Sequence, residues 1–296
     1  MKKVLFATTA LVASAGVAAA DLTFGGSARF GVTYNDSRAE EAKIHNRFTL
    51  NIDGSSETDG GLTFFARVRV RGGNTAGAGD STSSSGVSAP RVGVKTGGFT
   101  LAVGNINGAL ESTPGLYSGA VGLTGLSWGN LPLNNSAAGS FWWDSFSSAG
   151  GGVNGVEVIY SANGLGFHVS HSEVTDETSA HVSYNFGDWT AALAVADGPT
   201  AGEEATMVTL GGSIGSVSVG LAAADVDGLT NVRVNAGFDV GAGTTVTAYY
   251  QSNDGSADDT YGLGFTHSLG GATLAGGVSN TFTGATVADF GVRFGF

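Results

Sequence analysis

The amino-acid sequence predicts an all-β protein, a sixteen-stranded antiparallel transmembrane β-barrel. Three observations lead to this class. The chain ends in a strand with one apolar and one polar face, the same two-residue period returns throughout the sequence after residue 20, and basic residues avoid the apolar face. Helical periodicity is almost absent, and no later stretch approaches the roughly 18 consecutive apolar residues that a membrane-spanning helix requires.

The final segment, residues 287–296, shows the two-residue period most clearly. Large apolar residues occupy every second position, namely Phe290, Val292, Phe294 and Phe296. Successive side chains of a strand point to opposite faces, so these four residues share one face. A soluble domain rarely ends its last strand on a bare Phe, whereas an outer-membrane barrel can place such a residue in the aromatic girdle at the lipid boundary.

Sixteen segments with this period are expected along the chain. In the first, Phe24 and Phe30 share a face with other apolar residues, and in the second Ile44 and Phe48 do so. The expected strands are, in order, residues 22–34, 44–57, 61–71, 87–96, 98–105, 153–162, 165–173, 178–187, 188–197, 203–214, 216–225, 229–240, 244–253, 257–268, 272–282 and 285–296.

The connections between these segments alternate in length. One set is short and glycine-rich, which is typical of hairpin turns: residues 58–61, 97–98, 163–164, 187–188, 215–216, 241–243 and 270–271. The other set is longer or more acidic and includes residues 35–43, 72–86 and 107–152. Short turns at one end and longer loops at the other indicate an up-and-down barrel. A soluble β-sandwich is the alternative, but it would need mixed connections and polar outer faces.

Residues 1–20 are expected to form a cleaved signal peptide, which leaves residues 21–296 as the barrel. Lys2 and Lys3 give a basic start, residues 4–17 are mostly apolar, and residues 18–20 form a small-residue cleavage site of three alanines. A membrane anchor is the alternative, but the apolar stretch is short and contains two threonines and a serine.

Composition and charge narrow the function classes. The net charge of −12 at pH 7, without a basic cluster that also carries stacking aromatics, argues against nucleic acid as a partner. There is no cysteine, so an exported chain needs another source of stability, and a closed hydrogen-bonded barrel supplies one.

The basic residues support the assignment of faces independently. Nine of them fall on the face opposite to the apolar one: Arg29, Arg47, Arg67, Arg69, Arg71, Arg91, Lys95, Arg233 and Arg293. An Arg that faces lipid at the bilayer centre costs about 2–4 kcal/mol, so these side chains are expected to point into a water-filled interior. A barrel of sixteen strands is wide enough for an aqueous channel. A few inward positions are apolar instead, namely Phe65, Ile159, Met207 and Tyr249.

Four stretches of the sequence carry a resemblance to a known family. They are residues 22–31 (LTFGGSARFG), 53–64 (DGSSETDGGLTF), 103–106 (VGNI) and 286–294 (TVADFGVRF). They are similar, in turn, to the first strand, the first periplasmic turn, the start of the constriction loop and the closing strand of the trimeric general porins of Gram-negative bacteria, of the α-proteobacterial type. The resemblance covers the whole chain after residue 20. It implies a homotrimer of water-filled channels, each narrowed by a third loop folded into the lumen.

The resemblance also implies where the narrowest point lies. The basic wall would consist of Arg29, Arg47, Arg67, Arg69 and Arg71, with Arg91 and Lys95 nearby. In the family this wall faces acidic groups on the loop, and here the sequence departs from the pattern. Between Ile106 and Phe141 the only acid is Glu111, which is therefore the expected loop-side group of the constriction. The alternative for the arginines is a set of structural ion pairs with Asp53, Glu157 or Asp289, and both roles can hold at once.

The loop 107–152 is too long for an ordinary hairpin connection. It contains many large apolar residues, among them Leu116, Trp128 and Trp142, which is unlike a disordered loop. The resemblance implies that the loop packs inside the barrel as a constriction. A cap over the mouth and a contact between trimer subunits are the alternatives.

Acidic residues gather where the outer loops are expected. Oxygen ligands suit Ca²⁺, so a weak structural Ca²⁺ site is expected at Asp176, Glu177, Glu203 and Glu204, and no other cofactor is implied. Such ions could bridge lipopolysaccharide to the loops. The alternative is that these loops are simply solvated, since no EF-hand spacing is present.

Together these features predict a passive channel of the cell outer membrane, which lets small hydrophilic solutes and ions diffuse down their gradients among outer-membrane lipids and lipopolysaccharide. The alternative is a barrel with an enzymatic role, such as a lipid hydrolase, or an adhesin or other binding role. No G-x-S-x-G nucleophile elbow is present, so the chain is not expected to be an enzyme.

Overall fold

A computed structural model describes residues 20–74, 83–134, 146–148, 150–199, 204–256 and 258–296. Residues 1–19 of the predicted signal peptide, and residues 135–145 and 149 of the predicted constriction loop, lie outside this part. No described residues form a helix that is long and apolar enough to cross a membrane.

All strands belong to one sheet. Their bounds are β1 (Ala20–Asn35), β2 (Ala42–Glu57), β3 (Thr63–Gly73), β4 (Ser83–Val87), β5 (Arg91–Thr96), β6 (Phe99–Gly104), β7 (Gly155–Ala162), β8 (Leu165–Ser172), β9 (Thr178–Phe186), β10 (Trp189–Asp197), β11 (Ala205–Ile214), β12 (Val217–Val226), β13 (Leu229–Gly241), β14 (Thr244–Asn253), β15 (Thr260–Ser268), β16 (Thr273–Asn280) and β17 (Thr286–Gly295). One short 3₁₀ turn, η1 (Leu126–Trp128), follows β6.

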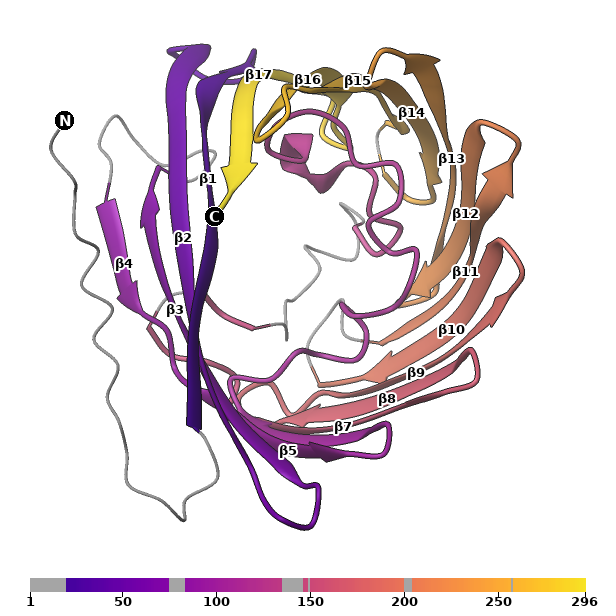
Figure 1. Cartoon of the computed structure of the whole chain (residues 1–296). Coiled ribbons are helices and arrows are strands. Elements are labelled where there is room, and N and C mark those ends of the chain that lie inside the picture. The colour runs from indigo at the N-terminus through magenta and orange to yellow at the C-terminus, as the bar shows by residue number, and fades with distance from the viewer. Residues whose placement is uncertain (1–19, 75–82, 135–145, 149, 200–203, 257) are drawn as a thin grey trace, which may run out of the picture.

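The sheet closes into a barrel (Figure 1). Neighbouring strands pair antiparallel, and β17 pairs with β1 from Asn35↔Val287 to Ser27↔Gly295. Since β4 and β5 both pair with β3, they share one place in the wall, and the barrel has sixteen strands. The predicted fold class is therefore confirmed.

The strand predicted at residues 87–96 differs in detail. It begins earlier, at Ser83, and is interrupted between Val87 and Arg91. Pro90 lies in the interruption and has no N–H to give to the ladder, which explains why pairing stops there. Ser88 bridges the gap, because its N–H donates to the carbonyl of Arg69 at 2.8 Å and its Oγ accepts from the N–H of Arg69 at 2.9 Å.

The outer face of the barrel is apolar and exposed. Phe24 is 63% exposed and Ile44 is 76% exposed, and large apolar side chains on almost every strand resemble them. A monomeric soluble protein rarely exposes a continuous apolar surface of this extent. This face therefore needs an apolar environment around it.

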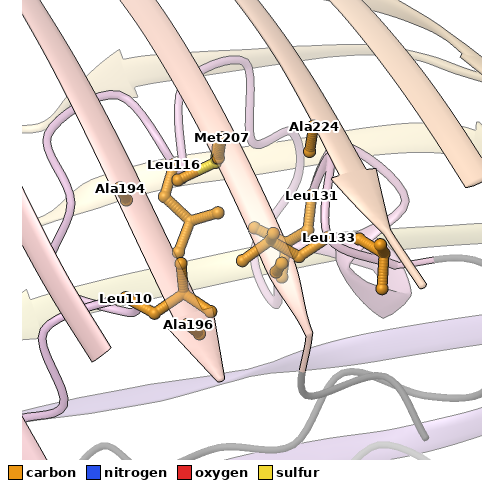
Figure 2. Packing of buried hydrophobic residues seen from close by; sticks show 10 residues of the cluster. Leu110, Leu116, Leu131, Leu133, Ala194, Ala196, Met207 and Ala224 are labelled. Carbon is orange, nitrogen blue, oxygen red and sulfur yellow. The ribbon is translucent and has the colours of Figure 1, made fainter. Parts of the chain in front are cut away.

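The hydrophobic core lies inside the barrel, between the wall and the segment that follows β6. Leu110, Leu116, Leu131 and Leu133 from this segment pack on small residues and Met207 of β10–β12 (Figure 2). A second cluster joins Val121 and Leu126 to Tyr249 and Val287. The inner wall thus has two apolar patches beneath this segment.

Candidate functional site

The segment from Asn105 to Asn134, called here the inner loop, runs along the inside of the barrel and is hydrogen-bonded to its wall. Figure 1 shows it running inside the wall toward β15–β17. The side chains that hold it come from strands far apart in sequence. They include Thr209 bonded to Pro114, Asn231 to Pro132, Gln251 to Leu131 and Thr260 to Gly129.

Arg233 of β13 makes the strongest of these attachments. Its Nη1 donates to the carbonyl oxygens of Leu116 at 2.6 Å and Asn130 at 2.8 Å, and its Nη2 donates to that of Gly115 at 2.6 Å. The side chain is fully buried. Hydrogen bonds from a charged donor are stronger than neutral ones, so Arg233 joins two separate turns of the loop firmly.

Asp289 of the closing strand holds the tip of the inner loop. Its Oδ1 accepts from the N–H of Leu123 at 2.7 Å, and its Oδ2 accepts from both the N–H and the hydroxyl of Thr124, each at 2.7 Å. A carboxylate that accepts several N–H and O–H bonds fixes the backbone that donates them.

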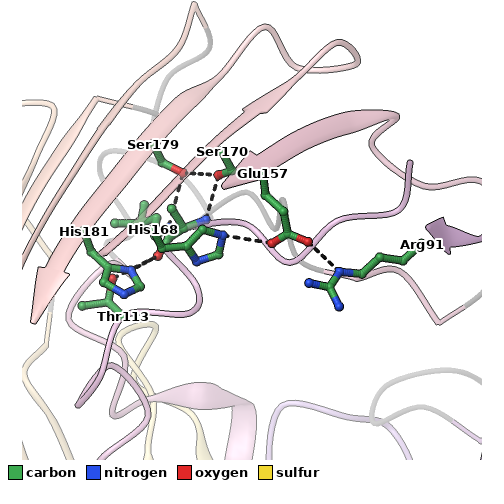
Figure 3. A network of polar contacts seen from close by, with 9 residues as sticks. Arg91, Thr113, Glu157, His168, Ser170, Ser179 and His181 are labelled. Atoms are coloured by element: carbon green, nitrogen blue, oxygen red, sulfur yellow. Dashed lines mark hydrogen bonds and ion pairs between the residues drawn. The ribbon is translucent and has the colours of Figure 1, made fainter. Parts of the chain in front are cut away.

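The root of the inner loop is fixed to β8 and β9 (Figure 3). The N–H groups of Ala109 and Leu110 donate to the hydroxyls of Ser170 at 2.8 Å and Ser179 at 3.3 Å. His181 Nδ1 donates to the carbonyl of Ala109 at 2.7 Å. Its ring lies 5.4 Å from that of His168, so the contacts continue toward β7.

The three arginines of β3 each bond to the residue directly opposite on β2. Arg67 Nε donates to Asp53 at 2.5 Å, Arg69 Nε to Asn51 at 2.7 Å, and Arg71 Nε to Thr49 at 3.2 Å. Arg69 also reaches the returning part of the long loop, where its Nη1 donates to Ser148 at 2.8 Å and its guanidinium lies over the ring of Phe146. The run of cations is thus held by one carboxylate and several neutral acceptors.

Arg91 and Lys95 lie beside this run on β5. Arg91 Nε donates to Glu157 at 2.5 Å, and the second oxygen of Glu157 lies 2.9 Å from His168 Nε2. Arg67, Arg91 and Lys95 line one cavity of about 430 Å³. Two of the structural ion pairs foreseen as alternatives, with Asp53 and with Glu157, are therefore present.

Arg29 and Arg47 lie on β1 and β2, where the barrel closes. Arg29 Nε donates to His45 Nε2 at 2.9 Å, and its Nη1 donates to the carbonyl of Leu123 at 3.1 Å. Arg47 is directly opposite Arg29 in the strand register. The predicted wall residues therefore divide between two neighbouring regions, β3 with β5 and β1 with β2.

Glu111 lies away from these regions. It is buried at the β8–β9 side, next to the bonded backbone of Ala109 and Leu110. Burial raises the pKa of the Tyr117 phenol, and the negative charge of Glu111 adds to this shift. The Glu111 carboxylate thus interacts electrostatically with the Tyr117 side chain within the inner loop.

Within the described part of the chain, no group of three His, Cys, Asp or Glu side chains converges. Glu177 is buried, whereas Asp176 and Glu204 are exposed. Glu203 lies outside the described residues. Weak Ca²⁺ binding by these four residues stays a prediction.

The residues that anchor the inner loop were not predicted as functional residues. Arg233 and Asp289 were placed on the inward face, or considered as ion-pair partners, without a role toward the loop. The sequence does contain a pattern from which these anchors could be predicted. Long polar side chains occupy inward positions of the later strands, and the apolar loop contains many backbone N–H and C=O groups that need hydrogen-bond partners.

Comparisons with known proteins agree with this architecture. The profile of the Gram-negative porin family matches residues 7–286. The porin of Fuscovulum blasticum is 30% identical over 298 residues, which cover 93% of this chain and 100% of the relative. Among solved structures, a triple mutant of the Rhodopseudomonas blastica porin is similar, with a TM-score of 0.81 and 26% identity over 93% of this chain and 100% of that chain.

Proposed function

Because the chain belongs to the Gram-negative porin family, whose members are passive outer-membrane diffusion channels rather than enzymes, we propose that its channel is narrowed by the third loop and faced by an arginine-rich wall. Small hydrophilic solutes and ions diffuse through it down their gradients. No energy source takes part. Export through a cleaved signal peptide at residues 1–20 belongs to the same proposal.

The proposal that the channel is narrowed is supported by the hydrogen bonds between the inner loop and the inside of the barrel wall. Arg233 and Asp289 bond to its backbone at five positions, so the loop has a fixed place in the cross-section. A barrel of sixteen strands without an inner loop would leave a wide channel. The inner loop reduces that width along the side of β8–β17, where its backbone is hydrogen-bonded to the wall.

Liposome swelling with sugars of graded size tests this function. We expect monosaccharides to enter quickly and larger oligosaccharides progressively more slowly, because a fixed constriction sets the size limit. A variant in which a Gly-Ser linker replaces residues 107–134 should admit larger sugars at a higher rate. Failure of the reconstituted wild-type protein to admit any small sugar would refute the channel.

We further propose that the chain forms a homotrimer through the outer side of β1–β5 and β17. Small residues gather there, including Ala28, Ala66 and Ala89, and they allow close approach of two barrels, whereas Gly26 is covered by the ring of Phe296. Native mass spectrometry after gentle detergent extraction should give three times the mass of one barrel. A single-barrel mass together with one-step conductance events would contradict the trimer.

A further inference from the structure

Three arginines stand side by side where the barrel closes. In the strand register Arg29 of β1 is directly opposite Arg293 of β17 on one side and Arg47 of β2 on the other. Residues that are directly opposite in an antiparallel pair share a face, and like charges in this position destabilise the sheet. The row therefore has a cost in stability, which calls for a functional reason.

The row borders open space. Two adjoining cavities, of about 330 and 250 Å³, share the same four lining residues, Arg29, Arg47, Arg293 and Leu123. Hydroxyl-bearing residues also line them, Ser27 and Thr273 in one and Thr124, Thr247 and Thr266 in the other, beside apolar residues such as Phe294 and Trp128. The arginines and the hydroxyls of Ser27, Thr273, Thr247 and Thr266 can donate hydrogen bonds to an anion, whereas the hydroxyl of Thr124 already donates to Asp289.

The charge of this row is poorly balanced. In the described part of the chain, ion pairs join Arg67 to Asp53 and Arg91 to Glu157, but none joins Arg29, Arg47 or Arg293 to a carboxylate. Arg29 donates instead to an imidazole nitrogen and a carbonyl oxygen. The acid that acts on Arg29 electrostatically is Asp289, both of whose oxygens accept from the inner loop. Among the described residues, Arg67 and Arg91 are thus paired with acids, whereas this row carries a net positive charge.

We propose that Arg29, Arg47 and Arg293, with the neighbouring hydroxyls, form a subsite in the lumen that binds phosphate, either as the free anion or as the phosphoryl group of a small solute. Guanidinium groups match phosphate oxygens with two parallel hydrogen bonds, and a tetrahedral anion can accept from more than one arginine at once. The subsite rests on the proposed channel and gives it a preferred solute class.

Single-channel recording in planar bilayers tests the subsite, with increasing inorganic phosphate added at a constant chloride concentration. We expect phosphate to reduce the chloride current in a saturable manner. A second arm with a small phosphate monoester, glycerol phosphate, distinguishes the free anion from a phosphorylated solute, because the tighter binder gives the lower half-saturation concentration. Arg47→Ala and Arg293→Ala should each raise that concentration at least tenfold. Arg29 is left intact because it also holds Leu123.

Lys95→Ala is the matched control, since it removes one positive charge from a different cavity of the lumen. It should change the half-saturation concentration less than twofold. Arg293→Lys keeps the charge but not the planar fork, so it should weaken binding less than alanine does. An equal effect of Lys95→Ala and Arg293→Ala, or a phosphate effect that never saturates, would overturn the subsite while leaving the channel intact. Absence of any KCl current through the wild-type protein would instead refute the proposed function.

Discussion

Arg233 has a fully buried cationic side chain that donates hydrogen bonds to three backbone carbonyls. A buried charge is tolerated only when it is well hydrogen-bonded, so the three carbonyl dipoles of the inner loop stabilise Arg233 as much as it stabilises them. This mutual dependence makes Arg233 a positioning residue for the loop.

Replacing Arg233 with methionine should leave the barrel able to form but loosen the loop. Three buried carbonyl groups lose their donor, and each unsatisfied buried acceptor costs about 1–3 kcal/mol. We expect the free energy of unfolding to fall by about 3 kcal/mol or more, measured by urea titration in detergent. Arg38→Met, in the loop between β1 and β2, is the control and should change it by less than about 0.5 kcal/mol. Equal values for the two variants would show that the carbonyl bonds contribute little.

The inward apolar residues show which features of single residues can be predicted from the sequence. Met207 and Tyr249 broke the predicted alternation of apolar and polar faces, and the structure explains both, because the inner loop packs on them. Alternation is a local property and could be predicted from neighbouring residues. Which loop residue meets which wall residue depends on contacts that are about 100 residues apart in sequence, and no local pattern contains them.

At the scale of elements, the strands could be predicted almost completely, because each carries its own alternation and each turn its own glycine. Asn163 and Gly164, for example, both have positive φ, as a two-residue hairpin turn requires. The predicted order of sixteen strands agrees with the structure. The division of one strand into β4 and β5 was not predicted, although Pro90 marks it. The pairing of Arg69 and Arg71 with Asn51 and Thr49 was also not predicted, since register depends on how the whole hairpin closes.

The wild-type inner loop should stay fixed while ions pass, so that the single-channel current is steady. The Asp289→Asn substitution should let the loop move and make the current fluctuate. The amide offers one acceptor oxygen in place of two, so the donors of either Leu123 or Thr124 lose their partner. We expect excess current noise and brief substates in single-channel records, while the average conductance changes by less than about twofold.

Asp53→Asn is the control for this experiment. It also removes one carboxylate, but that carboxylate pairs with Arg67 and does not hold the inner loop. It should change ion selectivity and leave the noise as in the wild type. Similar noise in both variants would mean that lost negative charge, and not a loosened loop, causes the fluctuations.

For the whole molecule, two sets of charges compete for the ions that pass. The chain is acidic overall, with a net charge of −12, and many acids lie in the outer loops. The lumen instead carries the arginines of β1–β3, β5 and β17, of which Arg67 and Arg91 are paired with acids. Exposed charges are screened over about 8–10 Å at physiological salt, so the outer acids enrich cations at the mouth but reach the arginine wall weakly.

This balance predicts weak selectivity that changes with salt. At 1 M KCl, where screening reaches only about 3 Å, the local arginines should dominate and the channel should lean toward anions. At about 0.01 M, where screening extends to about 30 Å, the outer acids should act further and shift the preference toward cations. Reversal potentials in KCl gradients measure both limits.

Arg67→Ala should shift the preference toward cations more than Arg69→Ala does, because it also leaves Asp53 without its partner, whereas Arg69 bonds to neutral groups. Arg38→Ala, outside the barrel wall, should leave the potential at 1 M unchanged. A cation preference on the order of ten to one at 1 M, unaffected by either lumen substitution, would contradict the arginine wall as the groups that ions meet at this screening length.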